Sequence, residues 1–318
     1  CVRTEHAWAR APAARVGLKV SGAWNRLRTE LRDLLELVLL PGLAAVLPWP
    51  LCYRLFRRLA RWDGLYREAS HAALAQARAR GWALDEADWL LKRRLVTLVD
   101  HADFYLARTR SDTWMHSHLR VEGAWPAAQT AGILCTFHWG AGMWGLRHAH
   151  AQGLRAHPLV AALEGAHFQG RSVLHWYARV RTAEVARTLD CASLDVSSSL
   201  RPVLRALRQH EQVVAAIDVP SDQVAASQSV DVLGMPMLVP KALLRLAVEQ
   251  RIPVTLYLTG IDLDSGQRFV RIMPLGVRDD LASLMQEVFG VLDRAIQAEP
   301  AAWHFWGEAP RFFRAPHA

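Results

Sequence analysis

A histidine at the end of an apolar run is the residue best placed for acid–base chemistry. Residues 132–139, GILCTFHW, predict a buried strand, and the following GAGMWGLRHAHAQG predicts a loop that enters a helix. His138 is therefore expected at the carboxyl end of that strand, the edge where open α/β sheets bind ligands. An imidazole there could take a proton from a substrate hydroxyl or amine near neutral pH.

The same segment permits a second interpretation, because it contains three glycines at the spacing GxGxxG: Gly140, Gly142 and Gly145. Glu164 closes the next predicted strand, HPLVAALE, which completes the outline of a dinucleotide-binding βαβ unit. This pattern predicts an NAD(P)-dependent oxidoreductase as an alternative. The motif lies in mid-chain after a long helical segment, and the bulky His138 and Trp139 crowd the turn, which argues against that alternative.

A carboxylate is expected at the same sheet edge as His138. Asp218 follows the buried-strand run in VVAAIDVPSDQ and precedes a proline, Pro220, by two residues. Glu164 closes an apparent strand in the same way. A surface carboxylate is the competing interpretation for Glu164. A cysteine nucleophile paired with His138 is disfavoured, since Cys135 lies three residues away and on the opposite face of the strand.

The elements that must position these residues begin with a hydrophobic segment. Residues 34–53, LLELVLLPGLAAVLPWPLCY, carry one charge, and prolines interrupt them, so a continuous membrane span is not expected. The segment predicts a helical hairpin or two short helices in a membrane interface, with Trp49 and Tyr53 at headgroup depth. A buried helix pair of a soluble protein is the alternative. The segment is flanked by arginines suited to anionic lipid: Arg26, Arg28, Arg32, Arg54, Arg57, Arg58 and Arg61.

The sequence predicts one α/β domain that follows an N-terminal membrane-associated part. Residues 1–62 form the predicted membrane-associated part, and residues 63–318 form an α/β domain that is helical over 63–124 and contains the sheet in 125–318. The predicted fold is a central mixed sheet flanked by helices. No long linker or internal repeat divides the chain.

Composition narrows the function classes. The 318 residues include 38 basic and 30 acidic side chains, a net charge of +8 that favours anionic partners. Four cysteines without a CxxC pair argue against a zinc site and for a reducing compartment. Thirteen tryptophans occur without a nucleic-acid-binding signature, so no nucleic acid is expected as a partner.

Several blocks, in order, resemble the lipid A biosynthesis lauroyl/myristoyl acyltransferases and related lysophospholipid acyltransferases. TFHWGAGMW resembles the block in which a strand ends in H-x-x-x-x-D/E. The likeness extends to the LP-rich segment near the start, to the strand before Asp218, to VDVLGMPMLVPKALLRLAVEQRIPVTLYL and to the terminal PAAWHFWGEAPRFF. The resemblance implies an α/β acyltransferase fold that covers most of the chain.

The resemblance also implies a mechanism, with one departure. His138 would be the general base that activates an acceptor hydroxyl or amine for attack on an acyl thioester. Met143 stands where the family has the carboxylate that orients the histidine. Three possibilities follow: another acid, Asp218 or Glu164, reaches His138; the histidine works unassisted at a reduced rate; or the reaction has been lost. The last would leave a catalytically silent relative that binds acyl chains or partners at a membrane.

The remaining implied roles concern the substrates. Asp218 would pair with Arg179 or Arg181, and these would hold a phosphate of the carrier or of a glycolipid. The backbone N–H groups of Gly140 and Gly142 would hold an oxyanion or phosphate. The donor would be an acyl carrier protein or acyl-CoA, and the acceptor an amphipathic lipid. The protein would lie peripherally or monotopically on the cytoplasmic face of a bacterial inner membrane. No cofactor and no metal are expected.

Overall fold

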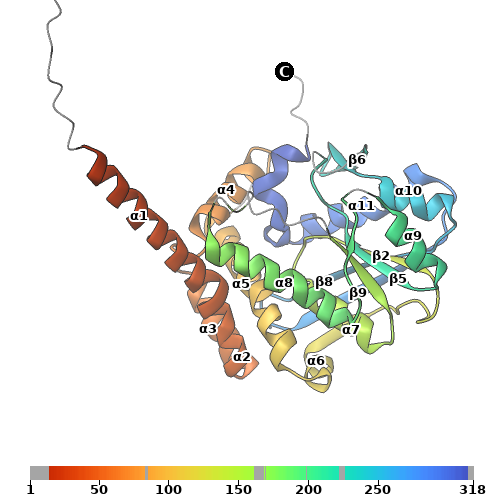
Figure 1. The fold of residues 1–318 in the computed structure, drawn as a ribbon, viewed down its shortest axis with the longest axis horizontal. Helices are drawn as coiled ribbons and strands as arrows, with labels where there is room; N and C mark the ends of the chain where they lie inside the picture. Colours follow the sequence, from red (N-terminus) through yellow and green to blue (C-terminus); the bar gives the residue numbers. More distant parts are fainter. Residues whose placement is uncertain are drawn as a thin grey trace, which may run out of the picture.

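The computed structural model describes residues 14–82, 85–160, 168, 170–197, 199–221 and 226–313, without the side chains of residues 14–22. Glu164 therefore lies outside the described residues. The main sheet has the strand order β1-β9-β8-β2-β5-β3-β4. Figure 1 shows the helices arranged around this sheet. Its strands are β1 (Leu119–Glu122), β2 (Gly132–Thr136), β3 (Ala156–Val160), β4 (Leu194–Asp195), β5 (Gln212–Ala216), β8 (Val254–Ile261) and β9 (Arg268–Gly276).

The sheet is mixed. β2 pairs in parallel with β5 on one side and with β8 on the other, whereas β8 and β9 are antiparallel. A separate antiparallel hairpin is formed by β6 (Ser227–Val232) and β7 (Met235–Pro240). The expected α/β fold, with a mixed central sheet flanked by helices, is confirmed for the described residues.

Helices cover both faces of the sheet. One apolar cluster joins the strands to α9 (Arg201–Arg208), α10 (Ala242–Glu249) and α11 (Leu281–Ala298). A second cluster joins the other face to α3 (Trp49–Leu59), α5 (Glu86–Thr109) and α7 (Met143–Ala151). α8 (Ser172–Leu189) packs against α7, and α4 (Arg67–Arg78) lies beside the carboxyl-terminal 3₁₀ segment η5 (His304–Arg311). The preceding 3₁₀ segment, η4 (Pro300–Ala302), packs against α5 and α11.

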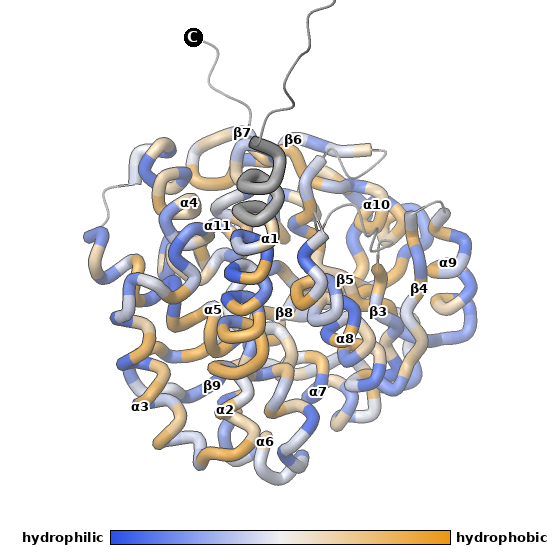
Figure 2. Tube along the Cα trace, turned by 60° about the vertical axis from the view of Figure 1, so that its left-hand side comes forward, coloured by the Kyte–Doolittle hydropathy of each residue, from blue (hydrophilic) through white to orange (hydrophobic). Residues whose placement is uncertain are grey.

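The N-terminal helices form an arm along one side of the molecule (Figures 1 and 2). α1 (Ala14–Asp33) continues through a π-helical turn, η1 (Leu34–Leu39), into α2 (Leu40–Val46). Pro41 lies in the first turn of α2, directly after the π-helical turn, and the helix continues through it. The break comes at Pro48, and α3 follows. No helix in the described part of the chain is both long and apolar enough to cross a membrane.

Two expectations for this region were wrong. Trp49 and Tyr53 do not lie at an exposed interface; both are buried, with the Trp49 indole donating to the Gly266 carbonyl and the Tyr53 hydroxyl to the Leu263 carbonyl. They attach α3 to the β8–β9 turn. The segment 63–124 was predicted to be helical throughout, but its helices end with α6 (Asp112–His118), and β1 follows and joins the sheet.

Candidate active site

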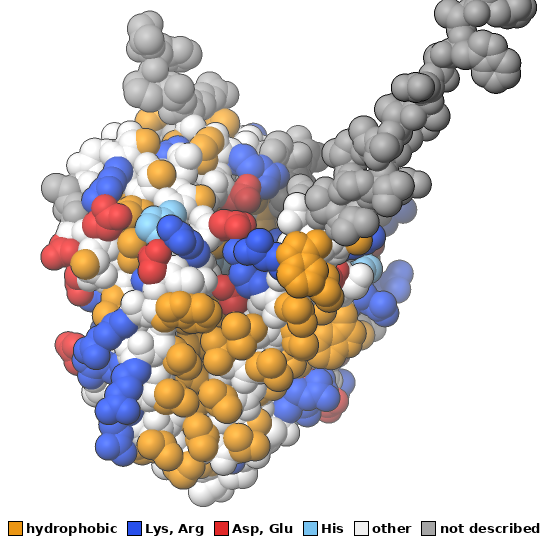
Figure 3. Space-filling model, turned by 90° about the vertical axis from the view of Figure 1, so that its left-hand side faces the viewer, with side chains coloured by type: hydrophobic (Ala, Val, Ile, Leu, Met, Phe, Trp, Pro, Cys, Tyr) orange, Lys and Arg blue, Asp and Glu red, His pale blue; other side chains and the backbone are white. Residues whose placement is uncertain are grey.

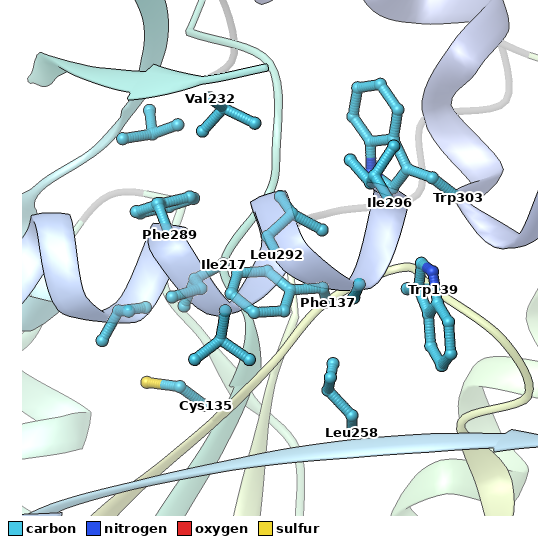
Figure 4. Packing of buried hydrophobic residues seen from close by; sticks show 14 of the residues in the cluster. Cys135, Phe137, Trp139, Ile217, Val232, Leu258, Phe289, Leu292, Ile296 and Trp303 are labelled. Carbon is cyan, nitrogen blue, oxygen red and sulfur yellow. The ribbon is translucent and has the colours of Figure 1, made fainter. Parts of the chain in front are cut away.

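The end of β2 presents alternate side chains to opposite faces of the sheet. Cys135, Phe137 and Trp139 belong to the cluster beneath α11, where the ring centroids of Phe137 and Phe289 lie 5.7 Å apart (Figure 4). Strand alternation turns Thr136 and His138 to the other face, toward α7 and α8. The apolar packing of one set therefore fixes the direction of the other.

His138 meets a carboxylate from the neighbouring strand. Its Nδ1 lies 2.9 Å from Oδ1 of Asp218, and its backbone N–H donates to both carboxylate oxygens at 2.9 and 3.1 Å. Thr136 is paired with Ala216 in the parallel register of β2 and β5. Two residues further along each strand come His138 and Asp218, so the register itself brings them together.

Asp218 is completely buried and held by a third donor. The indole Nε1 of Trp303, which is also fully buried, donates to its Oδ2 at 3.0 Å. The ring centroid of Phe305 lies 4.4 Å from that of His138. A carboxylate that accepts from an imidazole Nδ1–H leaves Nε2 as the nitrogen free to take a proton. The pair therefore has the geometry of a general base with its orienting acid.

The predicted pairing of Asp218 with an arginine was wrong. Nη2 of Arg181 donates to both carboxylate oxygens of Asp100 on α5, at 2.8 and 2.7 Å, and Nη1 lies 3.1 Å from Nδ1 of His101. Burial alone would raise the pKa of Asp100, but Arg181, His304 and His101 together outweigh it and lower that pKa to about 2. Arg179 lies exposed on α8. Arg181 does line the cavity beside His138, but with its charge already neutralised.

The two glycines predicted to hold an oxyanion, Gly140 and Gly142, differ in whether they can contact a ligand. The N–H of Gly140 donates to the Ala302 carbonyl at 3.0 Å, so it is not available to a substrate. Gly140 has φ +71°, and a Cβ there would lie 2.4 Å from the Thr259 carbonyl oxygen. Gly142 is the N-cap of α7 and lines the cavity. The first N–H groups of α7 have no intrahelical partners and can bind an anion.

The GxGxxG glycines do not lie in a dinucleotide-binding unit of the usual form. In such a unit the two strands that flank the helix are neighbours in the sheet. Here β5 lies between β2 and β3. Gly145 allows α7 to approach β8, because a Cβ would lie 2.4 Å from the Thr259 hydroxyl. The oxidoreductase alternative therefore gains no support from the topology.

A second histidine, His304, for which no sequence pattern predicts a role, forms hydrogen bonds with the turn after His138. The backbone N–H of His304 donates to the His138 carbonyl at 2.8 Å, and its Nε2 donates to the Gly140 carbonyl at 2.7 Å. Burial lowers the pKa of His304 to about 4. The buried guanidinium of Arg93 donates to three carbonyls of the same segment: Ala301, Trp303 and His304.

A cavity of about 460 Å³ opens beside His138 between the sheet and the helices α7 and α8. Its lining includes the Asp100–Arg181 pair and His304, and most of its other side chains are apolar. The apolar lining residues include Met143, Leu146, Leu159, Val160, Val185 and Val214. The cavity can receive a hydrocarbon chain with its reactive end at the histidine.

Comparisons with known proteins add no further guide. No protein-family model matches the chain, and no curated protein matches it.

Proposed function

We propose that the protein is an acyltransferase that moves a fatty or related acyl chain from a carrier thioester to a hydroxyl or amine of an amphipathic acceptor. The observation that carries the proposal is the contact of Asp218 with Nδ1 of His138 beside a mainly apolar cavity. Asp218 takes the role of the acid that is missing at Met143. The resemblance to the lauroyl/myristoyl acyltransferases is consistent with this assignment.

The reaction needs only side chains and backbone. Nε2 of His138 takes the proton of the acceptor hydroxyl, and Asp218 stabilises the imidazolium that forms. The acceptor oxygen attacks the thioester carbonyl, and the resulting oxyanion is stabilised by the first N–H groups of α7, near Gly142. When the carbon–sulfur bond breaks, the imidazolium returns its proton to the leaving thiolate. The products are an ester and a free carrier thiol.

Charge and cavity shape suggest the substrates. The aliphatic lining suits a fatty acyl chain, and the net charge of +8 suits an acidic acyl carrier protein or another anionic partner. Because Arg181 is paired with Asp100, we assign it to positioning α8 against α5 rather than to binding a phosphate. We assign no binding role to Arg179.

The N-terminal arm is the proposed membrane-binding face. Figure 3 shows apolar side chains gathered there, with Lys and Arg side chains on either side. The exposed apolar residues come from α1, η1, α2, α3 and the turn after α3: Trp24, Leu27, Leu31, Leu34, Leu39, Val46, Leu51 and Trp62. We call these eight residues the apolar face. An apolar surface bordered by arginines suits the interface of an anionic bilayer, on the cytoplasmic side of an inner membrane.

The test is a transfer assay. Wild-type protein and His138→Ala are incubated with a panel of acyl-carrier thioesters and a membrane lipid extract, and the masses of the lipids and carriers are measured by mass spectrometry. Transfer by the wild type and its loss in the variant would support the proposal and name the acceptor. If neither protein transfers an acyl chain but both bind fatty acids equally well, the protein is a silent binding relative and the proposal is wrong.

A further inference from the structure

Three arginines form a row on the exposed side of α9. Arg201, Arg205 and Arg208 are spaced i, i+4 and i+7, so they share one face of the helix over about 10 Å. All three are exposed, and none of their side chains makes an ion pair or a hydrogen bond with a residue that the structure describes. We call these three residues the arginine row. The row is a patch of positive charge that the fold leaves unpaired.

The acidic residues nearest to α9 in the chain do not neutralise the row. The carboxylate of Asp195, before the helix, accepts a hydrogen bond from the backbone N–H of Ser197 at 2.8 Å. Oε2 of Glu211, after the helix, lies 3.0 Å from Nε2 of His157. The positive charge of α9 therefore faces solvent.

The packing of α9 does not need these charges. Its buried residues, Val203, Ala206 and Leu207, lie on the opposite face and belong to the apolar cluster beneath the sheet. Arg201 stands in the first turn, where the helix dipole disfavours a positive charge. It also precedes Arg205 by four residues, which adds repulsion between like charges. The row lowers the stability of the helix, and an anionic partner would account for its presence.

The position of α9 relates the row to the candidate active site. The helix follows β4 and precedes β5, and both of these strands run parallel to β3. It therefore runs back from the carboxyl ends of the strands, and Arg201 lies nearer than Arg208 to the sheet edge that holds His138. Figure 1 shows α9 at the opposite end of the molecule from α1, α2 and α3. The row stays accessible when the apolar face lies on a membrane.

We propose that the arginine row docks the acidic carrier protein that delivers the acyl thioester. Carboxylates along one face of a carrier helix would match the spacing of the arginines, and a guanidinium group pairs with a carboxylate through two hydrogen bonds. α9, which the structure describes in full, exposes no large apolar side chain, so the contact is electrostatic and sensitive to salt. The inference rests on the proposed function for the cargo of the carrier.

Binding of a bacterial acyl carrier protein loaded with dodecanoate tests this inference without turnover. The dissociation constant is measured for the wild type and for the triple variant Arg201→Gln, Arg205→Gln and Arg208→Gln. At low ionic strength we expect the triple variant to bind at least about tenfold more weakly. The difference should disappear at about 1 M salt, where the Debye length is about 3 Å.

A matched control neutralises three arginines at the opposite edge of the sheet. Arg120 of β1 and Arg271 of β9 both contact Glu122, and Arg278 follows β9 and contacts Glu287. These strands lie at the edge of the main sheet away from β5, against which α9 packs. Exchange of all three for Gln lowers the net charge as much as the α9 variant does. The control should bind the carrier within about threefold of the wild type.

A single substitution separates docking from folding. Arg201→Glu places a carboxylate in the first turn of α9, four residues before Arg205, and both changes favour the helix. Its urea unfolding midpoint should be equal to or higher than that of the wild type, whereas its dissociation constant for the carrier should rise at least about threefold. Unchanged carrier binding by Arg201→Glu would overturn the inference.

Three other results would also overturn it: no binding of the carrier by the wild type, equal losses in the two triple variants, or tighter binding of a DNA oligonucleotide that depends on the same row. Transfer from dodecanoyl-CoA, a donor without a carrier protein, keeps the proposed function separate. If transfer from this donor depends on His138 but the row does not affect carrier binding, the docking inference fails and the proposed function stands. Absence of transfer from either donor would defeat the proposed function, whereas carrier binding that depends on the row would still support docking.

Discussion

The hydroxyl of Thr188 on α8 donates to the sulfur of Met143 at 3.6 Å. Met143 is buried and joins α7 to α8 through this contact. The position five residues after the histidine thus serves helix packing, and a carboxylate from the adjacent strand meets the imidazole instead. In this chain the group that contacts the His138 imidazole therefore does not come from α7, the helix that follows the histidine. Exchange of Met143 for another apolar side chain should therefore leave chemistry intact.

Asp218→Asn should reduce the acyl-transfer rate by about 10²- to 10⁴-fold, because an amide can hold the imidazole in the wrong tautomer and cannot stabilise its charged form. Met143→Leu should stay within about threefold of the wild type, since it preserves volume in a packing position. The rate with a saturating acyl-carrier thioester measures both effects. Asp231→Asn, at an exposed position on β6, is the control. Comparable losses in Asp218→Asn and Asp231→Asn would contradict the assignment.

Trp303→Phe should weaken both the fold and the catalytic pair. The variant loses the indole donor to Asp218, a hydrogen bond to a charged group worth about 1.5–3 kcal/mol, and leaves a small cavity. Trp306 is a matched control, since it is also fully buried and its Nε1 donates to the Pro300 carbonyl. Urea unfolding should show similar losses for Trp303→Phe and Trp306→Phe. Only Trp303→Phe should shift the pH dependence of the transfer rate; an identical shift in both would refute a specific role.

The sequence indicated the sheet edge and both members of the proposed catalytic pair, but gave the contact of Asp218 with His138 only as one of several possibilities. A strand-like run before His138 and another before Asp218 predict the same edge for both. That β5 lies next to β2 depends on pairing between segments 80 residues apart, which no local pattern specifies. For the same reason the partner of Arg181 could not be predicted, since Asp100 lies within a long helix of a different part of the chain.

The N-terminal arm shows a second limit of sequence analysis. Residues 34–53 are apolar nearly throughout, so hydropathy could not tell the buried side from the exposed side. Trp49 is buried against Gly266, whereas Leu51, two residues later, is exposed. The helix was predictable, but its rotation is set by contacts with the β8–β9 turn. The apolar face became recognisable only once those contacts were known.

Protonation of His304 should destabilise the fold on mild acidification. Its pKa is lowered to about 4 by burial, whereas an unfolded chain has an ordinary histidine pKa near 6.5. Between these values the unfolded state binds more protons, so stability is full above about pH 6.5 and falls toward pH 4, by at most about 1.4 kcal/mol per pH unit. His101, with a pKa of about 3, adds to this slope.

Urea unfolding of the wild type and His304→Gln from pH 4 to pH 7 measures this effect. The variant removes one titrating group near Asp100, Arg93 and Arg181 and should show a flatter pH dependence than the wild type. Carboxylates with raised pKa values, such as Asp103 and Glu299, change the free energy of unfolding with pH in the opposite direction. Their contribution cancels when the pH profile of one protein is subtracted from that of the other. Parallel pH profiles for the two proteins would show that His304 does not titrate as expected.

The apolar face should bind anionic vesicles. Leu39→Glu combined with Leu51→Glu removes apolar contact area, where each leucine contributes about 1.5–3 kcal/mol when fully buried, and adds repulsion from anionic lipid. Sedimentation with phosphatidylglycerol vesicles should show at least about tenfold weaker binding. Val121→Glu with Val277→Glu changes exposed valines outside the apolar face and is the control. Equal binding by the wild type and both double variants would contradict the assignment of this face.

Gly140 and Gly142 distinguish the acyltransferase from the dinucleotide-binding alternative. Gly140→Ala should destabilise by about 2 kcal/mol or more, because of its positive φ and the close Thr259 carbonyl. Gly142 has φ −74°, and a Cβ there would meet no described residue within 4 Å apart from its chain neighbours, so Gly142→Ala should change stability by less than about 0.5 kcal/mol. A pyrophosphate site would need Gly142 for close backbone approach. NADH binding by the wild type that Gly142→Ala abolishes would favour the oxidoreductase; acyl transfer that survives Gly142→Ala, without NADH binding, favours the acyltransferase.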